Sequence, residues 1–132
     1  MKRILTILCL SLTYFISAQE IKHVEMCDLK FETNKDSTEM TVSKNGKLLA
    51  GKYKISGVFP EQHSLTEFIN GKAEGKSITV YNGIVIREKH FKNGLPNGIW
   101  TEFDDSGKEV LRKIYYLNGK RVSKSEYEKN NS

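Results

Sequence analysis

The chain has 132 residues, of which 38% are hydrophobic and 28% are charged. This length is enough for one small domain and too short for two ordinary ones. The 21 basic and 16 acidic residues give a formal net charge of +5. Because lysines and acids are interspersed and form no basic block, the composition does not predict nucleic-acid binding.

The N-terminal segment has the pattern of a secretory signal peptide. Lys2 and Arg3 precede a mainly apolar run over residues 4–16, and the small residue Ala18 follows it. The run is shorter than the roughly 20 apolar residues of a relaxed membrane span. We therefore predict a signal peptide over residues 1–18, cleavage near Ala18, and an exported protein that is periplasmic, envelope-associated or secreted. A buried N-terminal strand or helix is the alternative.

Removal of residues 1–18 would leave Cys27 as the only cysteine, so no intramolecular disulfide is predicted. A lone thiol most often behaves as a small hydrophobic side chain, and pairing with a partner is the alternative. His23, Glu25 and Cys27 alternate and would share one face of a strand, with side chains of the types that bind zinc. A closed zinc site needs a fourth ligand, so we predict a polar strand and no metal site.

Residues 19–43 lack the regular glycines found further along the chain. Two strands are expected, at Leu29–Thr33 and Glu39–Ser43, separated by a polar turn at residues 34–37. Because an unpaired sheet edge attracts other strands, we expect residues 19–43 to form N-terminal capping strands.

From residue 44 to 122 the chain is periodic. Glycines recur at intervals of 11 to 14 residues, and alternate ones follow an asparagine, at Gly46, Gly57, Gly71, Gly83, Gly94, Gly107 and Gly119. Asn-Gly favours a tight hairpin turn because both residues tolerate positive φ. Large aromatic residues stand two to four positions before most of these glycines. The spacing predicts an all-β fold in which successive β-hairpins form an antiparallel meander.

Two hairpins are predicted most clearly. Strands Ser77–Tyr81 and Ile84–Phe91 flank one turn, and strands Ile99–Phe103 and Glu109–Leu117 flank the next. Alternation along the second of these strands places apolar and charged residues on the same face, namely Val85, Arg87, Lys89 and Phe91. Such mixed faces favour a sheet that is only partly covered.

Two segments depart from the repeat. Residues 57–63 contain Pro60 and predict a loop, in which His63 would lie at the surface beside Glu61. Residues 123–132 are polar apart from Tyr127 and predict a half-unit or a frayed tail.

The spacing Asn-Gly-x-x-x-Gly-x-Trp-x-x-Phe, followed by Gly and Tyr-x-x-Asn-Gly, resembles the MORN repeat in its bacterial variant form. The chain is similar to the YwqK-like antitoxin and immunity family over about Asn45 to Val122, most strongly from Phe91 to Gly119. The resemblance implies an elongated MORN-like repeat sheet over residues 44–122. It also implies a protein partner, such as a toxin that the chain neutralises. Export is compatible with an immunity protein acting in the periplasm or with an envelope protein that has no toxin partner.

The sequence contains no nucleotide-binding, nucleophile-elbow or paired-histidine metalloprotease motif. Glu102, Asp104 and Asp105 cluster, and paired carboxylates can act as acid and base. However, Asp-Asp-Ser-Gly is first of all a turn sequence. We therefore predict a non-enzymatic binding module without a cofactor.

Trp100 and Tyr115 are the candidate contact residues, because aromatic side chains contribute much of the energy of protein interfaces. For Trp100 the alternative is a place in the core of the repeat. We predict another protein as partner and no nucleic acid. Two alternatives are a structural envelope repeat and peripheral membrane contact, which a resemblance to eukaryotic MORN proteins suggests. The chain lacks the cluster of about four to eight basic residues that anionic lipid surfaces attract, so membrane contact is not favoured.

Overall fold

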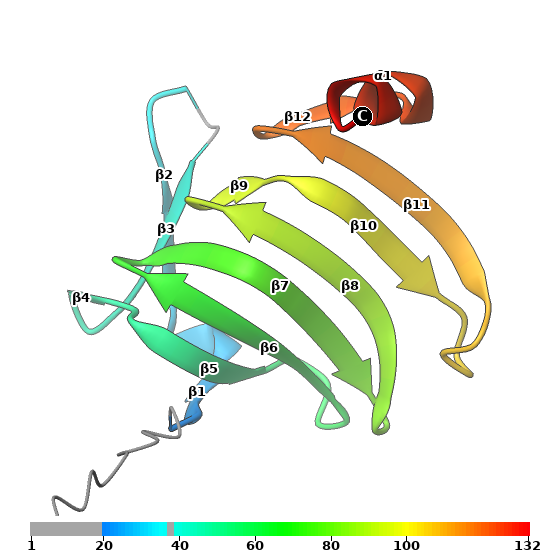
Figure 1. Cartoon of the computed structure of the whole chain (residues 1–132). Coiled ribbons are helices and arrows are strands. Elements are labelled where there is room, and N and C mark those ends of the chain that lie inside the picture. The colour runs from blue at the N-terminus through cyan, green and yellow to red at the C-terminus, as the bar shows by residue number, and fades with distance from the viewer. Residues whose placement is uncertain (1–19, 37–38) are drawn as a thin grey trace, which may run out of the picture.

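The computed structural model describes residues 20–36 and 39–132 of the chain (Figure 1). The predicted signal peptide therefore lies outside the described residues. The predicted all-β fold is confirmed, because the described chain consists mainly of strands, with one 3-10 turn and one short C-terminal helix.

A large sheet forms the body of the protein. Its strands are β1 (Lys22–Glu25), β5 (Gly51–Ser56), β6 (Gln62–Ile69), β7 (Lys72–Tyr81), β8 (Ile84–Lys92), β9 (Leu95–Pro96), β10 (Gly98–Phe103), β11 (Val110–Leu117) and β12 (Lys120–Val122). The strand order is β1-β5-β6-β7-β8-β10-β11-β12, with β9 also paired to β8. From β5 onward, neighbours in the sheet are antiparallel and follow one another along the chain, except that the short β9 lies between β8 and β10. Strand β1 instead pairs with β5 in parallel.

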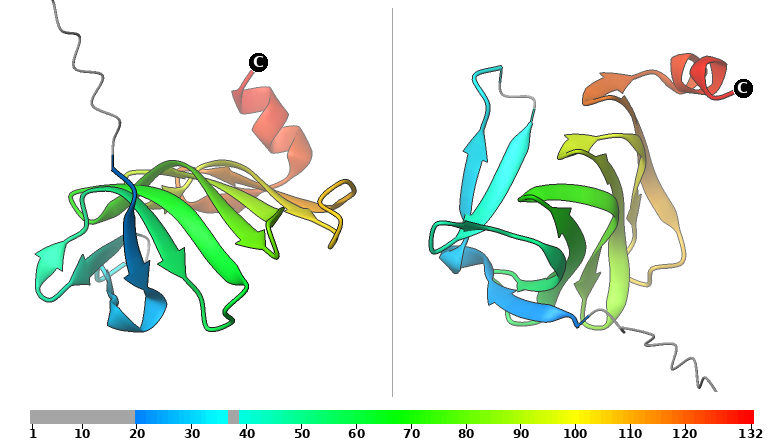
Figure 2. Two further views of the ribbon diagram at one scale, coloured as in Figure 1. Left: turned by 90° about the horizontal axis from the view of Figure 1, so that it is seen from below. Right: turned by 60° about the vertical axis from the view of Figure 1, so that its left-hand side comes forward.

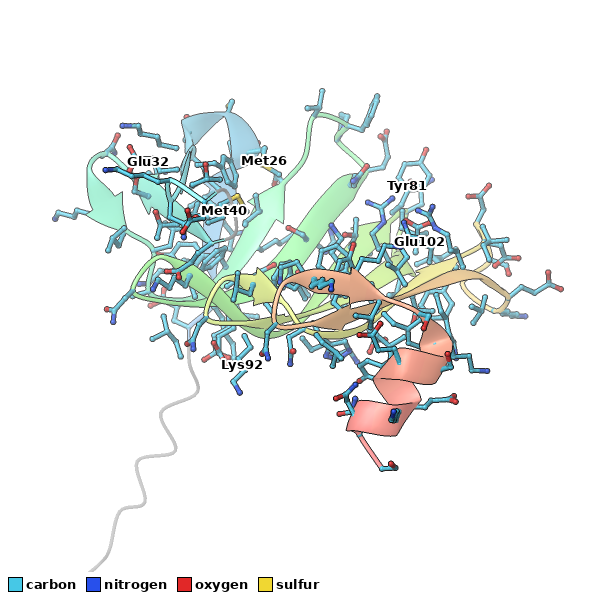
Figure 3. The ribbon with its side chains drawn as sticks, turned by 90° about the horizontal axis from the view of Figure 1, so that it is seen from above. Met26, Glu32, Met40, Tyr81, Lys92 and Glu102 are labelled. Atoms are coloured by element: carbon cyan, nitrogen blue, oxygen red, sulfur yellow. The ribbon has the colours of Figure 1, made fainter. Side chains whose placement is uncertain are left out.

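The remaining N-terminal elements form a second, smaller layer. After the 3-10 turn η1 (Met26–Asp28), strands β2 (Lys30–Thr33), β3 (Met40–Lys44) and β4 (Lys47–Leu48) make a three-stranded antiparallel sheet. This small sheet lies on one face of the large sheet, and helix α1 (Lys124–Asn130) lies on the other (Figures 2 and 3).

We name the two faces of the large sheet after the elements that lie on them. The face toward the small sheet is the hairpin face, which carries Phe68, Ser77, Arg87, Lys89, Phe91, Trp100, Glu102, Arg112 and Tyr116. The opposite face is the helix face, which carries Tyr115 and, by strand alternation, Glu88, Thr101 and Lys113.

The Asn-Gly turns have the conformation that the sequence predicts. Both residues have positive φ at all five pairs, with asparagine values between 47° and 51° at Asn45, Asn70, Asn82, Asn93 and Asn118. This left-handed geometry is that of the tight hairpin turn. Three turn glycines also donate their amides to the preceding segment, at 2.7 to 2.9 Å, through the pairs Gly71–Leu49, Gly94–Ala73 and Gly119–Pro96. Successive turns are thereby tied together along one rim of the sheet.

The buried core lies where the small sheet meets the first strands of the large one. It consists of Val24, Val42, Leu49, Tyr53, Ile55, Phe68 and Ala73. Val42 is only 1% exposed, and its amide donates to the Gly71 carbonyl at 2.7 Å. Most residues of β8 and β10 are only half-buried, in agreement with the mixed faces predicted from sequence.

One predicted face assignment on β8 is wrong. The β7–β8 pairing shifts between Thr79 and Val80, and this irregularity inserts an extra residue on β8. A bulge of this kind reverses the alternation of side chains beyond it. As a result Val85 lines a hollow with Glu88, whereas Arg87 lines the pocket on the hairpin face.

The predicted loop is shorter than expected. The Gly57 amide donates to the Gln62 carbonyl at 2.9 Å, and this bond closes the β5–β6 connection around Pro60. His63 therefore lies within β6, paired with Ser56, and is not in a surface loop.

The prediction of a half-unit or a frayed tail over residues 123–132 is also wrong, because residues Lys124–Asn130 form helix α1. The Ser123 hydroxyl accepts a hydrogen bond from the Glu126 amide at 3.2 Å and caps α1. A serine followed three residues later by glutamate is a recognised helix-start pattern. The Tyr127 ring then packs on Tyr115 with centroids 5.4 Å apart, and this contact holds the helix against the helix face.

Replacing Ser123 with alanine is expected to loosen α1 without unfolding the sheet. Loss of such a cap costs about 1 kcal/mol of helix stability, which corresponds to roughly fivefold faster exchange of the helix amides. The measurement is hydrogen exchange at the Tyr127 amide, which donates to the Ser123 carbonyl. Ser132→Ala, beyond the helix, is the control. Equal exchange in the two variants would show that the cap does not hold the helix.

Candidate functional site

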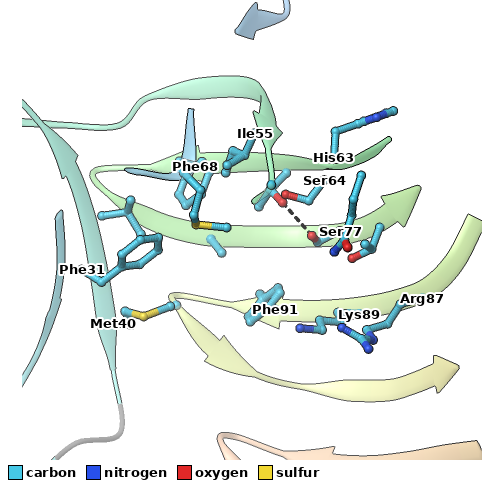
Figure 4. A pocket seen from close by; sticks show the side chains of 18 residues that line it. Phe31, Met40, Ile55, His63, Ser64, Phe68, Ser77, Arg87, Lys89 and Phe91 are labelled. Carbon is cyan, nitrogen blue, oxygen red and sulfur yellow. Dashed lines mark hydrogen bonds between the residues drawn. The ribbon is translucent and has the colours of Figure 1, made fainter. Parts of the chain in front are cut away.

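A partly enclosed groove lies between the hairpin face and the small sheet. Its volume is about 260 Å³. Strands β6, β7 and β8 form its floor, and the β2–β3 hairpin forms its roof (Figure 4). Since Phe91, Lys89 and Arg87 follow one another along β8, the groove runs parallel to the strands.

The two ends of the groove differ in chemistry. Phe31 and Met40 from the hairpin and Phe68 and Phe91 from the sheet surround the first end (Figure 4). At the other end the lining is polar, and it includes Ser64, Ser77, Thr79, Arg87 and Lys89. Thr66 and Ser77 share a hydrogen bond of 2.6 Å between their hydroxyl groups. The groove is therefore apolar under the hairpin, and it is cationic and hydroxyl-rich where it opens.

At the polar end, one carboxylate forms ion pairs with two guanidinium groups. Glu102 Oε2 accepts a hydrogen bond from Arg112 Nε at 3.1 Å, and Arg112 Nη2 forms a salt bridge with the same oxygen at 2.9 Å. Arg87 Nε lies 3.4 Å from the other oxygen of this carboxylate, and it is buried without a hydrogen-bond partner among the described residues. With Lys89, these groups comprise three cations and one anion, a formal excess of +2.

Arg87 and Arg112 each pair with Glu102, whereas Lys89 has no carboxylate within ion-pair distance among residues 20–36 and 39–132. Its ammonium lies over the Trp100 ring, 4.9 Å from the centroid. Burial lowers the pKa of Lys89 and the positive charge of Arg87 lowers it further, while Glu102 acts in the opposite direction. An anion placed beside Lys89 would compensate the cost of that burial.

The predicted contact residue Trp100 lies on the hairpin face, next to the groove. Its ring packs between Phe91 and Tyr116, with centroid distances of 5.3 and 4.7 Å. The indole Nε1 donates to the His90 carbonyl at 2.9 Å. These contacts hold the ring in a fixed position while it remains half-buried.

The second predicted contact residue, Tyr115, lies on the helix face under Tyr127. Ile114 is the residue opposite Trp100 in the β10–β11 register, so the adjacent Tyr115 points to the other side of the sheet. The structure therefore does not bring Trp100 and Tyr115 into one surface. Sequence reasoning also missed the grouping of Lys89 and Arg87 with Phe68, because it depends on strand pairing between distant segments.

The other clusters considered in the sequence have structural explanations. His23 and Glu25 lie in β1, but Cys27 lies in η1 with an exposed thiol, and no group of three potential metal ligands occurs in the described part of the chain. Asp104 organises the β10–β11 turn. Its pKa is lowered chiefly by a hydrogen bond of 2.7 Å from the Ser106 hydroxyl, and also by backbone amides.

No helix among the described residues has the length and apolar character needed to cross a bilayer. Comparisons with protein-family models, with curated proteins and with solved structures find no significant match to this chain. The resemblance to MORN repeats and to the YwqK-like family therefore stays a prediction from the sequence.

Glu102 should make the fold more sensitive to acid. The hydrogen bond from Arg112 is the chief cause that lowers the pKa of Glu102. The ionised carboxylate therefore stabilises the fold fully above the ordinary carboxyl pKa, and this stabilisation is lost as the pH falls through the lowered pKa of Glu102. We expect Glu102→Gln to be less stable than the parent at neutral pH, and the difference to shrink from about pH 5 to pH 3. The difference in free energy of unfolding should not exceed about 1 kcal/mol, because solvent screens the ion pairs of Glu102 with Arg87 and Arg112. Urea unfolding at each pH measures it.

The control for this prediction is Glu109→Gln, the same chemical change at an exposed position near the start of β11. A pH dependence that is identical in the two variants would show that the Arg112 contact does not stabilise the fold.

Proposed function

We propose that this chain is a non-enzymatic binding module that acts after export and holds another protein on its hairpin face. The observation that carries the proposal is the uncovered part of this face over β8, β10 and β11, where rings of Trp100 and Tyr116 adjoin cationic side chains. Fixed aromatic rings and arginine are the residue types enriched in the centres of protein interfaces.

The charge of this face supports an acidic partner. Arg87, Lys89 and Arg112 outnumber the single carboxylate of Glu102. Complementary charge speeds association and disfavours wrong partners, whereas packed rings keep the complex together when salt is raised. A toxin that this chain neutralises is one partner that fits the proposal and the sequence resemblance.

Two charge reversals at adjacent positions test the proposal. Arg112 lies on the hairpin face beside Glu102, and Lys113 lies on the helix face by strand alternation. Arg112→Glu and Lys113→Glu change the net charge equally, so each controls for the other. The full chain and both variants serve as bait for envelope and culture fractions of the source cell, at low and high salt.

We expect one protein to be retained by the parent chain and by Lys113→Glu at both salts, and to be reduced at least about tenfold with Arg112→Glu. Circular dichroism confirms that the variants are folded. Equal retention by the two variants would overturn the assignment to the hairpin face, and retention of no protein would overturn the function. If the retained protein is a toxin, its expression alone should inhibit growth, and co-expression of this chain should remove the inhibition.

The second candidate function is association with a membrane surface, which the β5–β6 loop favours. At its tip, Val58 is 88% exposed and Phe59 is 62% exposed. Adjacent exposed apolar residues can insert into the headgroup region of a bilayer. This function predicts that the chain floats with anionic vesicles and that the double change Val58→Ser and Phe59→Ser abolishes flotation. Absence of flotation at low salt excludes it.

A further inference from the structure

The apolar end of the groove sets a condition on what can occupy it. Phe31, Met40, Phe68 and Phe91 surround this end. A peptide main chain placed among them would lose water from its amide and carbonyl groups without gaining partners, which is strongly unfavourable. A hydrocarbon chain has no such groups. The occupant that fits this end is therefore a hydrocarbon.

The polar end sets a second condition. Lys89 is half-buried, and its ammonium lies over the Trp100 ring and within the influence of Arg87 and Glu102, without a salt bridge among the described residues. Arg87 lines the same end, where its buried Nε lies 3.4 Å from Glu102 without a hydrogen bond, and Ser77 and Thr79 lie nearby in buried positions. Burying a cation is favourable only when an anion or hydrogen-bond partner accompanies it. One anionic head group at this end would supply that partner.

The size of the groove limits the ligand further. A volume of about 260 Å³ is just below the range of roughly 300–1,000 Å³ typical of small-molecule pockets. Phe91 and Arg87 are four residues apart on β8, which corresponds to roughly 13 Å along the strand. These dimensions suit one unbranched chain of medium length and are too small for a lipid with two acyl chains.

We propose that the groove binds an alkyl carboxylate, a molecule of the fatty-acid class, with its chain between the hairpin and Phe68 and its carboxylate at Lys89 and Arg87. This small ligand differs from the protein partner proposed above, and the inference does not depend on that partner. The carboxylate forms charge-assisted hydrogen bonds with the Lys89 ammonium, which has no carboxylate partner in the described structure.

The test uses the full chain and decanoate as the probe, with decanol as a neutral probe of the same chain length. Trp100 is the only tryptophan, and it adjoins both Lys89 and Phe91, so its emission reports on the site. Calorimetric titration provides a second measurement that does not depend on this ring. We expect saturable decanoate binding at or below about 1 mM and an affinity for decanol at least about tenfold weaker.

Three variants locate the binding. Lys89→Gln should weaken decanoate binding at least about tenfold and bring it close to that of decanol, because the charge-assisted contact is lost. Lys113→Gln, the same change on the helix face, should have no effect. Met40→Gln, at a partly exposed position in the roof, should weaken both probes. Decanoate should also raise the unfolding temperature of the parent and of Lys113→Gln.

The inference would be overturned by any of three results. Decanoate does not bind saturably, it binds no more tightly than decanol, or it binds Lys89→Gln as tightly as the parent. These outcomes are separable from the proposed function. Loss of decanoate binding together with retention of an Arg112-dependent protein would remove the groove ligand and leave the binding module intact.

Discussion

Phe68→Ala is expected to lower the free energy of unfolding by about 3–5 kcal/mol, the usual cost of removing a buried aromatic side chain. Phe68 is 5% exposed and belongs to the core beneath the small sheet. Its ring meets Tyr53 edge-on, with centroids 5.8 Å apart. The substitution removes this contact and leaves a cavity that the rigid sheet cannot fill. Urea unfolding followed by circular dichroism measures the loss.

Phe59→Ala is the matched control, because the same atoms are removed from a side chain that is 62% exposed in the β5–β6 loop. Its effect should stay within about 0.5 kcal/mol, as for most surface changes. A similar loss in both variants would mean that the core is not concentrated between the small sheet and strands β5 to β7.

Gly71→Ala is expected to destabilise the fold by about 2–5 kcal/mol, because left-handed strain adds to a steric clash. Gly71 has φ of +78°, and an added Cβ would lie 2.7 Å from Leu48 Cδ2 and 3.0 Å from the Val42 carbonyl oxygen. The Leu48 side chain is exposed and can move, but the Val42 carbonyl is held by the Leu49 amide at 3.0 Å. The clash therefore separates the small sheet from the large one.

Gly83→Ala isolates the conformational part of this cost. Gly83 has the same φ of +78°, and an added Cβ there would meet nothing within 4 Å. Gly83→Ala should lower the free energy of unfolding by about 1–2 kcal/mol, which is the strain of a left-handed alanine alone. Thermal and urea unfolding of the two variants give the difference. Equal losses would show that close packing at Gly71 adds nothing to the requirement for glycine.

Local chemistry explains which parts of the fold were predictable. The Asn-Gly pairs require left-handed backbone wherever the chain turns, so the turns at Asn82 and Asn93 could be placed from sequence. The strands between them then follow from alternation and length. Helix α1 carried a readable start signal at Ser123, but with Tyr127 as its single large apolar residue it lacked the periodicity by which helices are usually identified.

Long-range pairing explains what was missed. Phe31 and Phe91 line the same groove, although 60 residues separate them in the chain, and nothing in either segment indicates the other. The parallel pairing of β1 with β5 is equally non-local. The bulge opposite Thr79 and Val80 shifts the alternation along β8, so counting residues back from Phe91 places Arg87 on the correct face and Val85 on the wrong one.

The order of strands in the large sheet also determines how the protein can fold. From β5 to β12 each strand needs only a short turn to reach its neighbour, so these contacts have low contact order and can form rapidly from any hairpin. Strand β1 pairs Lys22 with Tyr53, which requires a loop of about 30 residues to close at a greater entropic cost. We infer that β1 joins the sheet last. The outer edge of β5 then stays unpaired until β1 arrives, and during that time it is open to pairing with a strand of another chain.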